Sequence, residues 1–168
     1  YNKALEGAVD GGGMISYNYY SGEPITATEE GRPLFARLPD SPMSLATFMR
    51  VLLYSTVATL QIGMDILTDR EHVRLEQLLG HGGLFKTKGV GQRVMATALN
   101  VPVAVMESAG EGGAWGIALL AAYLHDKQQG EGLDEFLAKK VFASSKEDRI
   151  EPVAAEREGF LRFMEQYV

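Results

Sequence analysis

Apolar residues along this chain recur with the periods of helices and strands in alternating segments. From Leu45 to Leu67 they recur at helical spacing, which predicts one long helix with an apolar stripe. Ser41 followed by Pro42 is typical of a helix start, with a capping hydroxyl and a proline in the first turn. Four further helices are expected, over residues 88–99, 111–127, 133–141 and 150–167.

Short β-prone or apolar runs separate these helices. Residues 14–20 follow three glycines, and residues 101–106 form an apolar run between turn signals. Both runs predict strands, and the second is typical of a buried parallel strand. Residues 73–79 fit either a helix or a strand, and their alternation favours the strand, while residues 25–40 contain glycine and prolines and predict a loop. The alternating order predicts an α/β fold with a mostly parallel sheet flanked by helices.

Composition narrows the class of protein. The 168 residues are 46% hydrophobic, which is enough for a folded core. The formal net charge is −6 with no long basic run, so neither a nucleic acid nor a membrane is an expected partner. There is no cysteine, the three histidines are scattered, and no metal site is expected. No apolar run approaches the ~18 residues of a membrane span and no signal peptide is visible, so we expect a cytoplasmic protein.

Gly82 and Gly83 are the first candidate for a binding site. They lie between a predicted strand and a predicted helix, where glycine lets the backbone approach a ligand closely. The amides at the start of the following helix favour a phosphate, and Lys86, Lys88 and Arg93 flank the loop. The sequence is neither a Walker A motif nor a dinucleotide fingerprint. Taken alone, the glycine pair is more typical of an ordinary tight turn, and solvated surface is the simpler explanation for each basic residue.

Two other glycine-rich segments are weaker candidates. Residues 108–122 combine glycines and alanines so that the start of the predicted helix carries little side-chain bulk. Glycine inside a helix costs about 1 kcal/mol relative to alanine, so something is expected to press close, either another helix or a ligand. Asp10 and the three glycines after it precede a strand rather than a helix, which favours a turn.

Together these segments resemble the C-terminal domain of the FGGY family of carbohydrate kinases, which includes glycerol kinase, xylulokinase and ribulokinase. The resemblance spans about residues 10–125. The matching positions are Arg50, Gly82, Gly83, Gln92, Val101, Pro102, Val103, Glu107 or Glu111, and the helix at 114–118. Three positions depart from the family pattern: Tyr54 replaces a usual Glu, His81 a usual Asp or Gly, and Thr87 an Asn or Ser.

This resemblance implies an actin-like (ribonuclease H-like) ATPase lobe. Residues 1–168 would form the nucleotide-binding domain, or an incomplete part of it, and the N-terminal sugar-binding domain would be absent. The chain starts at Tyr1 rather than Met, and its first residues read as the middle of a longer protein. The intact enzyme would use ATP and Mg²⁺ to phosphorylate a sugar or polyol hydroxyl. The aspartate that deprotonates this hydroxyl would lie outside the chain, so no catalytic residue is expected here and the fragment alone would be inactive.

The resemblance also implies which residues contact the nucleotide. Gly82, Gly83 and Leu84 would line adenine and ribose through their main chain, and Thr87 is a candidate hydrogen-bonding partner. Weaker candidates for the pocket wall are Ser55, Thr59 and the turn at 108–112, which includes Gly110 and Gly112.

Two alternatives stay open at this point. One is the lobe of another actin-like ATPase, and the other is a non-catalytic interaction domain of the same fold, which His81 and Tyr54 favour. The identity of the sugar is not encoded in these residues. A homodimer is possible, because an exposed sheet edge or apolar face would allow copies of the chain to pair.

Overall fold

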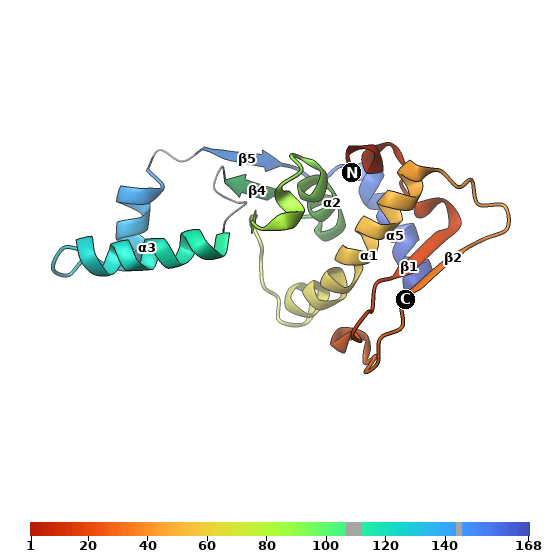
Figure 1. The fold of residues 1–168 in the computed structure, drawn as a ribbon, viewed down its shortest axis with the longest axis horizontal. Helices are drawn as coiled ribbons and strands as arrows, with labels where there is room; N and C mark the ends of the chain where they lie inside the picture. The colour runs from red at the N-terminus through yellow and green to blue at the C-terminus, as the bar shows by residue number, and fades with distance from the viewer. Residues whose placement is uncertain (107–111, 144–145) are drawn as a thin grey trace.

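A computed structural model of the chain describes residues 1–106, 112–143 and 146–168. Its helices and strands are β1 (Met14–Tyr17), β2 (Leu34–Arg37), α1 (Leu45–Asp65), β3 (Leu78–Gly80), α2 (Val90–Leu99), β4 (Val103–Met106), α3 (Gly112–Asp126), α4 (Leu133–Phe136), β5 (Glu147–Ile150) and α5 (Ala154–Tyr167). Most of them form one body, and α3 and α4 project from it as an arm (Figure 1).

The strands form two small sheets. In the first, β3 lies parallel to β4, with Gly80 opposite Val105, and β5 runs antiparallel along the other side of β4. In the second, β1 and β2 pair antiparallel. The predicted α/β class is confirmed, but the larger sheet is mixed rather than mostly parallel. The difference arises from β5, whose mainly charged sequence carries no apolar signal. No strand was expected there, and its last residue, Ile150, was expected to begin the final helix.

Two further expectations about the N-terminal half need correction. Part of the region expected to be a loop, residues 25–40, forms strand β2, all of whose residues are exposed. The long helix begins at Leu45 rather than near Ser41, because Ser44 is the residue whose side chain accepts the N–H of Thr47, at 3.1 Å. The Ser41 hydroxyl instead donates to the carbonyl of Gly13, at 3.0 Å, and so anchors the loop to the glycine turn.

Helix α1 is the centre of the hydrophobic core. It contacts α2, β1, α5 and the short 3₁₀ helix η1 (Asn2–Glu6). Its buried apolar face meets aromatic residues of α5, with the rings of Tyr54 and Phe160 edge to face at 5.0 Å. Burying a large apolar side chain stabilises the folded state by about 1.5–3 kcal/mol. Because α1 buries several such side chains against its neighbours, it holds these elements together.

Helix α1 continues into a π-helical turn, η4 (Ile66–Arg70), and this continuous helix is long and apolar enough to cross a membrane by length and composition. The expectation that no segment approaches that length was therefore wrong for residues 45–70. Its contacts with α2, α5 and β1 give a simpler reason for its apolar character, because core helices of folded domains have the same composition.

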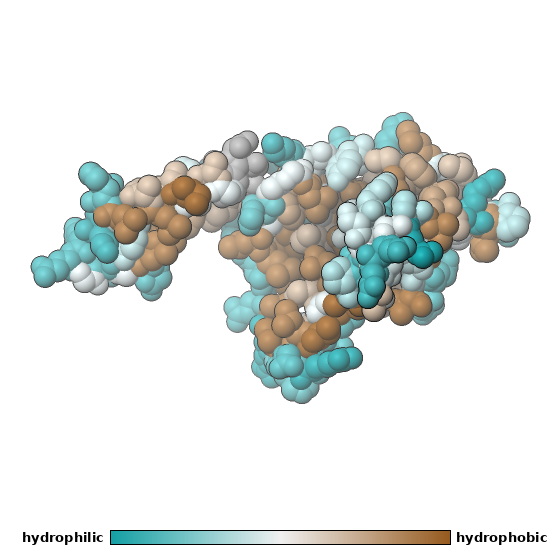
Figure 2. All heavy atoms as spheres, turned by 60° about the horizontal axis from the view of Figure 1, so that its bottom comes forward, coloured by the Kyte–Doolittle hydropathy of each residue, from teal (hydrophilic) through white to brown (hydrophobic). Residues whose placement is uncertain are grey.

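The arm is held together by its own contacts. The rings of Tyr123 on α3 and Phe136 on α4 lie 5.4 Å apart, and the Tyr123 hydroxyl donates to the carbonyl of Glu131 at 2.9 Å. Apolar side chains on α3, including Ile117 and Leu124, are exposed, and the arm carries brown, hydrophobic patches on the face shown in Figure 2. A helix that is apolar on all sides is typical of helices covered by other protein.

Candidate functional site

The carboxyl ends of the parallel strands β3 and β4 meet at one edge of the larger sheet. In α/β folds this edge is where ligands bind. A cavity of about 420 Å³ opens here. Its walls come from the loop after β3, the start of α2, the end of β4 and the start of β5; they are formed by Phe85, Lys88, Gly89, Gln92, Val105, Met106, Lys146, Glu147 and Asp148.

The glycine pair occupies the loop that borders this cavity. Gly82 has φ +97° and ψ −169°, a conformation that is essentially restricted to glycine. Gly83 opens a 3₁₀ turn, η5 (Gly83–Phe85), and its φ is not in the left-handed region. A Cβ added at either position would meet no atom of the described residues within 4 Å. The loop therefore presents bare main chain to open space, as a close-fitting flat ligand requires.

Two other glycines allow the loop to fold back on its own strand and helix. The ring of Phe85 lies over Gly80, where an added Cβ would come within 2.5 Å of Cζ. At Gly91 an added Cβ would lie 2.6 Å from the main-chain oxygen of Leu84. Neither Gly80 nor Gly91 was predicted as a site residue. The only signal was their presence at the end of a predicted strand and inside a predicted helix.

Gln92 ties α2 to the sheet beside the cavity. Its side-chain amide donates to the carbonyl of Val103 at 2.8 Å and to that of Asp148 at 2.6 Å. The side chain is buried, so both hydrogen bonds are shielded from water. One residue of α2 thus holds β4 and β5 in place under the cavity.

The charges around the cavity are mixed. Lys88 and Lys146 contribute ammonium groups, and Lys88 lies 3.5 Å from the carboxylate of Asp148. Gly89, with φ +78°, precedes the first turn of α2, whose amides carry the partial positive charge of a helix start. Two lysines and these amides suit an anion, whereas Arg93 points elsewhere and binds Glu156 at 2.9 Å.

The structure brings some of the predicted site residues together and separates others. Gly82, Gly83, Leu84 and Thr87 all lie in the loop, where Leu84 packs against the core and the Thr87 carbonyl accepts the N–H of Val90. The other predicted positions are Ser55 and Thr59 on α1, Gly112 at the start of α3, and Gly110, which is outside the described residues. Among the described residues, neither Ser55, which is buried, nor Thr59 lines the cavity. Gly82, Gly83, Leu84 and Thr87 do not line it either, although Phe85 and Lys88 of the same loop do.

Arg50, which matches the pattern of the kinase family, and Tyr54, which departs from it, form a buried pair in the core. Arg50 donates to the Tyr54 hydroxyl at 3.0 Å, and this hydroxyl donates to the carbonyl of Val9 at 2.9 Å. Burial raises the pKa of Tyr54, and the hydrogen bond from Arg50 opposes the shift. Tyr54 therefore has a structural role with satisfied partners.

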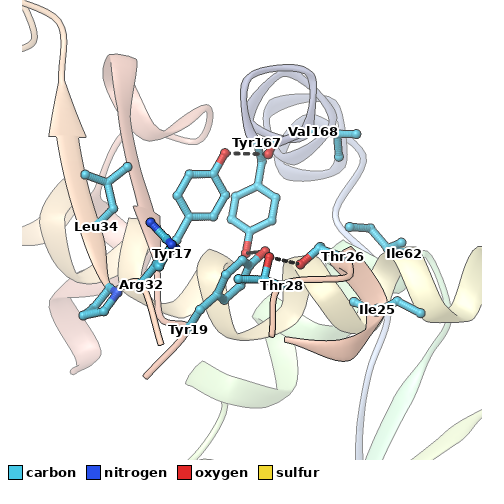
Figure 3. A pocket seen from close by; sticks show the side chains of 11 residues that line it. Tyr17, Tyr19, Ile25, Thr26, Thr28, Arg32, Leu34, Ile62, Tyr167 and Val168 are labelled. Atoms are coloured by element: carbon cyan, nitrogen blue, oxygen red, sulfur yellow. Dashed lines mark hydrogen bonds between the residues drawn. The ribbon is translucent and has the colours of Figure 1, made fainter. Parts of the chain in front are cut away.

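A second and larger cavity, of about 740 Å³, lies between β1, the end of α5 and the 3₁₀ turn η3 (Pro24–Thr26). Three tyrosines line one side of it (Figure 3). Tyr17 donates to the Tyr167 carbonyl at 2.7 Å, and Tyr167 donates to the Tyr19 hydroxyl at 2.9 Å. Desolvation raises the pKa of Tyr167 strongly. We favour the smaller cavity as the functional site, because it combines parallel strand ends, a glycine loop and lysines, all of which the tyrosine cavity lacks.

Neither cavity resembles a protein-based metal centre. Among the residues that the structure describes, no three His, Asp or Glu side chains come together in a way that could hold a metal ion. Charge near the smaller cavity is supplied by Lys88, which pairs with Asp148, and by Lys146 and Glu147.

Solved structures of several carbohydrate kinases have a similar fold. Xylulose kinase and gluconate kinase from Lactobacillus acidophilus superpose with TM-scores of 0.75 and 0.74, each at 18% identity. Glycerol kinase from Plasmodium falciparum, solved with ADP, gives a TM-score of 0.72 at 18% identity. Each alignment covers 99% of this chain and 32% of the kinase. The chain thus spans about a third of the length of these structures.

Sequence comparison defines the family. None of the curated proteins matches the sequence significantly. The model of the FGGY family of carbohydrate kinases, C-terminal domain, matches residues 1–125. These residues include the core helix α1, the glycine loop and the strand β4. The chain therefore belongs to the FGGY family of carbohydrate kinases, of which it carries the C-terminal domain.

Proposed function

We propose that this chain is the nucleotide-binding lobe of an ATP-dependent kinase that phosphorylates a sugar or polyol hydroxyl. The observation that carries the proposal is the loop at Gly82 and Gly83. It lies at the carboxyl end of β3, it presents main chain to open space, and it leads into the start of α2 beside a cavity.

The residues around the loop divide into two roles. The main chain of Gly82, Gly83 and Leu84 would lie against adenine and ribose, with Thr87 as a nearby hydroxyl. The lysines at the cavity and the first turn of α2 supply positive charge, which favours the phosphates. Mg²⁺ would be bound mainly through phosphate oxygens and water, so it needs no all-protein cage.

Phosphoryl transfer depends on positioning and electrostatic stabilisation more than on covalent chemistry by the protein. This lobe would hold the donor, and another domain would hold the sugar and the base that accepts the hydroxyl proton. We therefore expect no transfer from ATP to any pentulose or polyol by these 168 residues alone. The sugar specificity would be set by the rest of the enzyme.

The main competing function is that of an interaction domain that keeps the fold but binds no nucleotide. The exposed apolar side chains of α3 favour it. Tyr54 does not favour an interaction domain, because its hydroxyl accepts from Arg50 and donates to the carbonyl of Val9 within the core. Its replacement of the usual residue is therefore explained without loss of a nucleotide site.

Calorimetric titration with ATP and with ADP tests the proposal. Gly83→Val is the informative variant. Its side chain would occupy the position proposed for adenine, whereas its Cβ would meet no atom of the described residues within 4 Å. Gly116→Val on α3 is the matched control, since it also meets open space but lies on the arm. We expect Gly83→Val to abolish binding and Gly116→Val to leave it unchanged. Equal affinity of wild type and Gly83→Val, or no binding by wild type, would contradict the proposal.

A further inference from the structure

The inference concerns how the nucleotide loop is held, and it rests on the proposed function. We propose that Glu156 on α5 is a positioning residue for the nucleotide site and acts through Arg93 on α2. Neither residue lines the cavity among the described residues. Their effect on a ligand would be transmitted by the placement of α2.

The contact between the two side chains is a charged fork. Arg93 donates from Nε to one carboxylate oxygen of Glu156 at 2.9 Å and from Nη2 to the other at 3.2 Å. The Glu156 side chain is only 8% exposed, whereas that of Arg93 is 38% exposed. A two-point charge-assisted contact fixes orientation as well as distance. It therefore restrains the direction of α2 relative to α5 better than apolar packing alone.

The neighbouring residue Gln92 supplies the complementary restraint. Consecutive residues lie about 100° apart around a helix, so Gln92 and Arg93 hold different sides of the same turn. Gln92 fixes this turn to β4 and β5, and Arg93 fixes it to α5. With both contacts in place, this turn of α2 resists rotation and sliding. The turn lies next to the site, because Gly89 just before it lines the cavity and Gly91 contacts Leu84 of the loop.

Glu156 is held in place independently of Arg93. Arg50, 1% exposed, donates to Glu156 at 3.3 Å and is itself fixed by the carbonyls of Ala4 and Leu5 at 2.9 and 2.6 Å. Removing Arg93 would therefore leave the buried carboxylate paired with Arg50. Loss of Arg93 should then disturb α2 selectively, because the Arg93 side chain is 38% exposed and Glu156 keeps Arg50 as its buried partner.

The test compares nucleotide affinity with thermal stability in Arg93→Met. We expect the affinity for ATP and ADP, measured by calorimetry, to fall about tenfold, which corresponds to a coupling of about 1.4 kcal/mol between the ion pair and the site. The Tm should fall by no more than about 2–4 °C. Arg162→Met is the matched control, because it breaks the exposed Arg162–Glu158 pair on α5, at 2.9 Å, and should change neither value. An Arg93→Met protein of lower Tm but unchanged affinity would overturn the proposal, since a purely structural pair gives that result.

A double-mutant cycle tests whether the effect passes through Glu156. If it does, Arg93→Met combined with Glu156→Gln weakens binding no more than the stronger single variant. If Arg93 contacts the nucleotide directly, Glu156→Gln alone leaves affinity unchanged, which overturns the proposal. Should Glu156→Gln fail to fold, because it leaves Arg50 buried without a carboxylate, Glu156→Asp replaces it in the cycle, since the shorter side chain keeps a carboxylate for Arg50. A wild-type chain that binds neither ATP nor ADP removes the proposed function and this inference together, whereas normal wild-type binding with an unaffected Arg93→Met removes only the inference.

Discussion

The ring of Phe85 lies over the main chain of Gly80, so close that a Cβ at Gly80 would come within 2.5 Å of the ring carbon Cζ. The contact joins the last residue of β3 to the end of the 3₁₀ turn that carries Gly83. It turns the glycine loop back onto its own strand. The shape of the candidate site therefore depends on a glycine outside the Gly82–Gly83 pair.

We predict that Gly80→Ala lowers the free energy of unfolding by about 1–3 kcal/mol, the usual cost of forcing extra volume into a tight contact. Urea unfolding followed by circular dichroism measures the change. Gly116→Ala is the control, because its added Cβ meets open space within a helix and should stabilise slightly, by up to about 1 kcal/mol. Equal stability of Gly80→Ala and wild type would show that Phe85 moves aside freely.

The two glycines of the loop should respond differently to alanine. Gly82→Ala places a side chain at φ +97° and should cost about 1–3 kcal/mol of stability. Gly83→Ala requires no such conformation and meets no described atom, so it should stay within about 0.5 kcal/mol of wild type. Parallel urea titrations of the two variants check this difference. The described loop geometry would be wrong if Gly83→Ala were the more damaging change.

Gln92→Leu should destabilise the chain by about 2–4 kcal/mol, because it removes one buried and one partly buried hydrogen bond and leaves two carbonyls with fewer donors. The loss should be visible as faster amide hydrogen exchange in β5. Gln77→Leu is the matched control, since Gln77 also makes two side-chain hydrogen bonds to β5, donating to Glu147 at 3.3 Å and accepting from Arg149 at 3.1 Å, and both are exposed to solvent. If both variants accelerated exchange in β5 equally, Gln92 would not be its specific anchor.

Alkaline pH should destabilise the fold through its tyrosines. Burial raises the pKa of Tyr54 and Tyr167, and the hydrogen bond with Tyr19 raises that of Tyr167 further. In the unfolded chain these groups ionise near pH ~10, so the unfolded state releases protons first. The contribution of these tyrosines to the free energy of unfolding is therefore complete below about pH 9 and is lost as pH rises beyond about 10. Urea unfolding at increasing pH should show this loss, and Tyr167→Phe should make it shallower; an unchanged slope would contradict the assignment.

Elements with a strong apolar pattern were predicted well from the sequence. The helix carrying Gln92 and the apolar strand after it correspond to α2 and β4. The strand favoured over residues 73–79, whose alternation is weak, is confirmed only in its last two residues, because β3 spans Leu78–Gly80. Strands β2 and β5 were missed for a physical reason. Their residues lie mostly exposed at sheet edges, so no buried face imposes an alternation that sequence inspection could detect.

Only part of the candidate site could be predicted from the sequence. The glycine pair stands out locally, because its position between a strand and a helix suggests bare main chain. The closeness of Phe85 to Gly80, and the direction of the Arg93 side chain, depend on tertiary packing. Glu156 lies 63 positions from Arg93 in the sequence, and nothing near Arg93 distinguishes an inward ion pair from a phosphate contact.

The most direct test of the nucleotide-binding claim is an ADP titration of the ¹⁵N-labelled chain followed by amide chemical shifts. The proposal predicts shifts concentrated on residues 82–89 and at the end of β4, with the tyrosine cavity around Tyr17 and Tyr167 unaffected. Shifts confined to the tyrosine cavity, or no shifts at millimolar ADP, would contradict it.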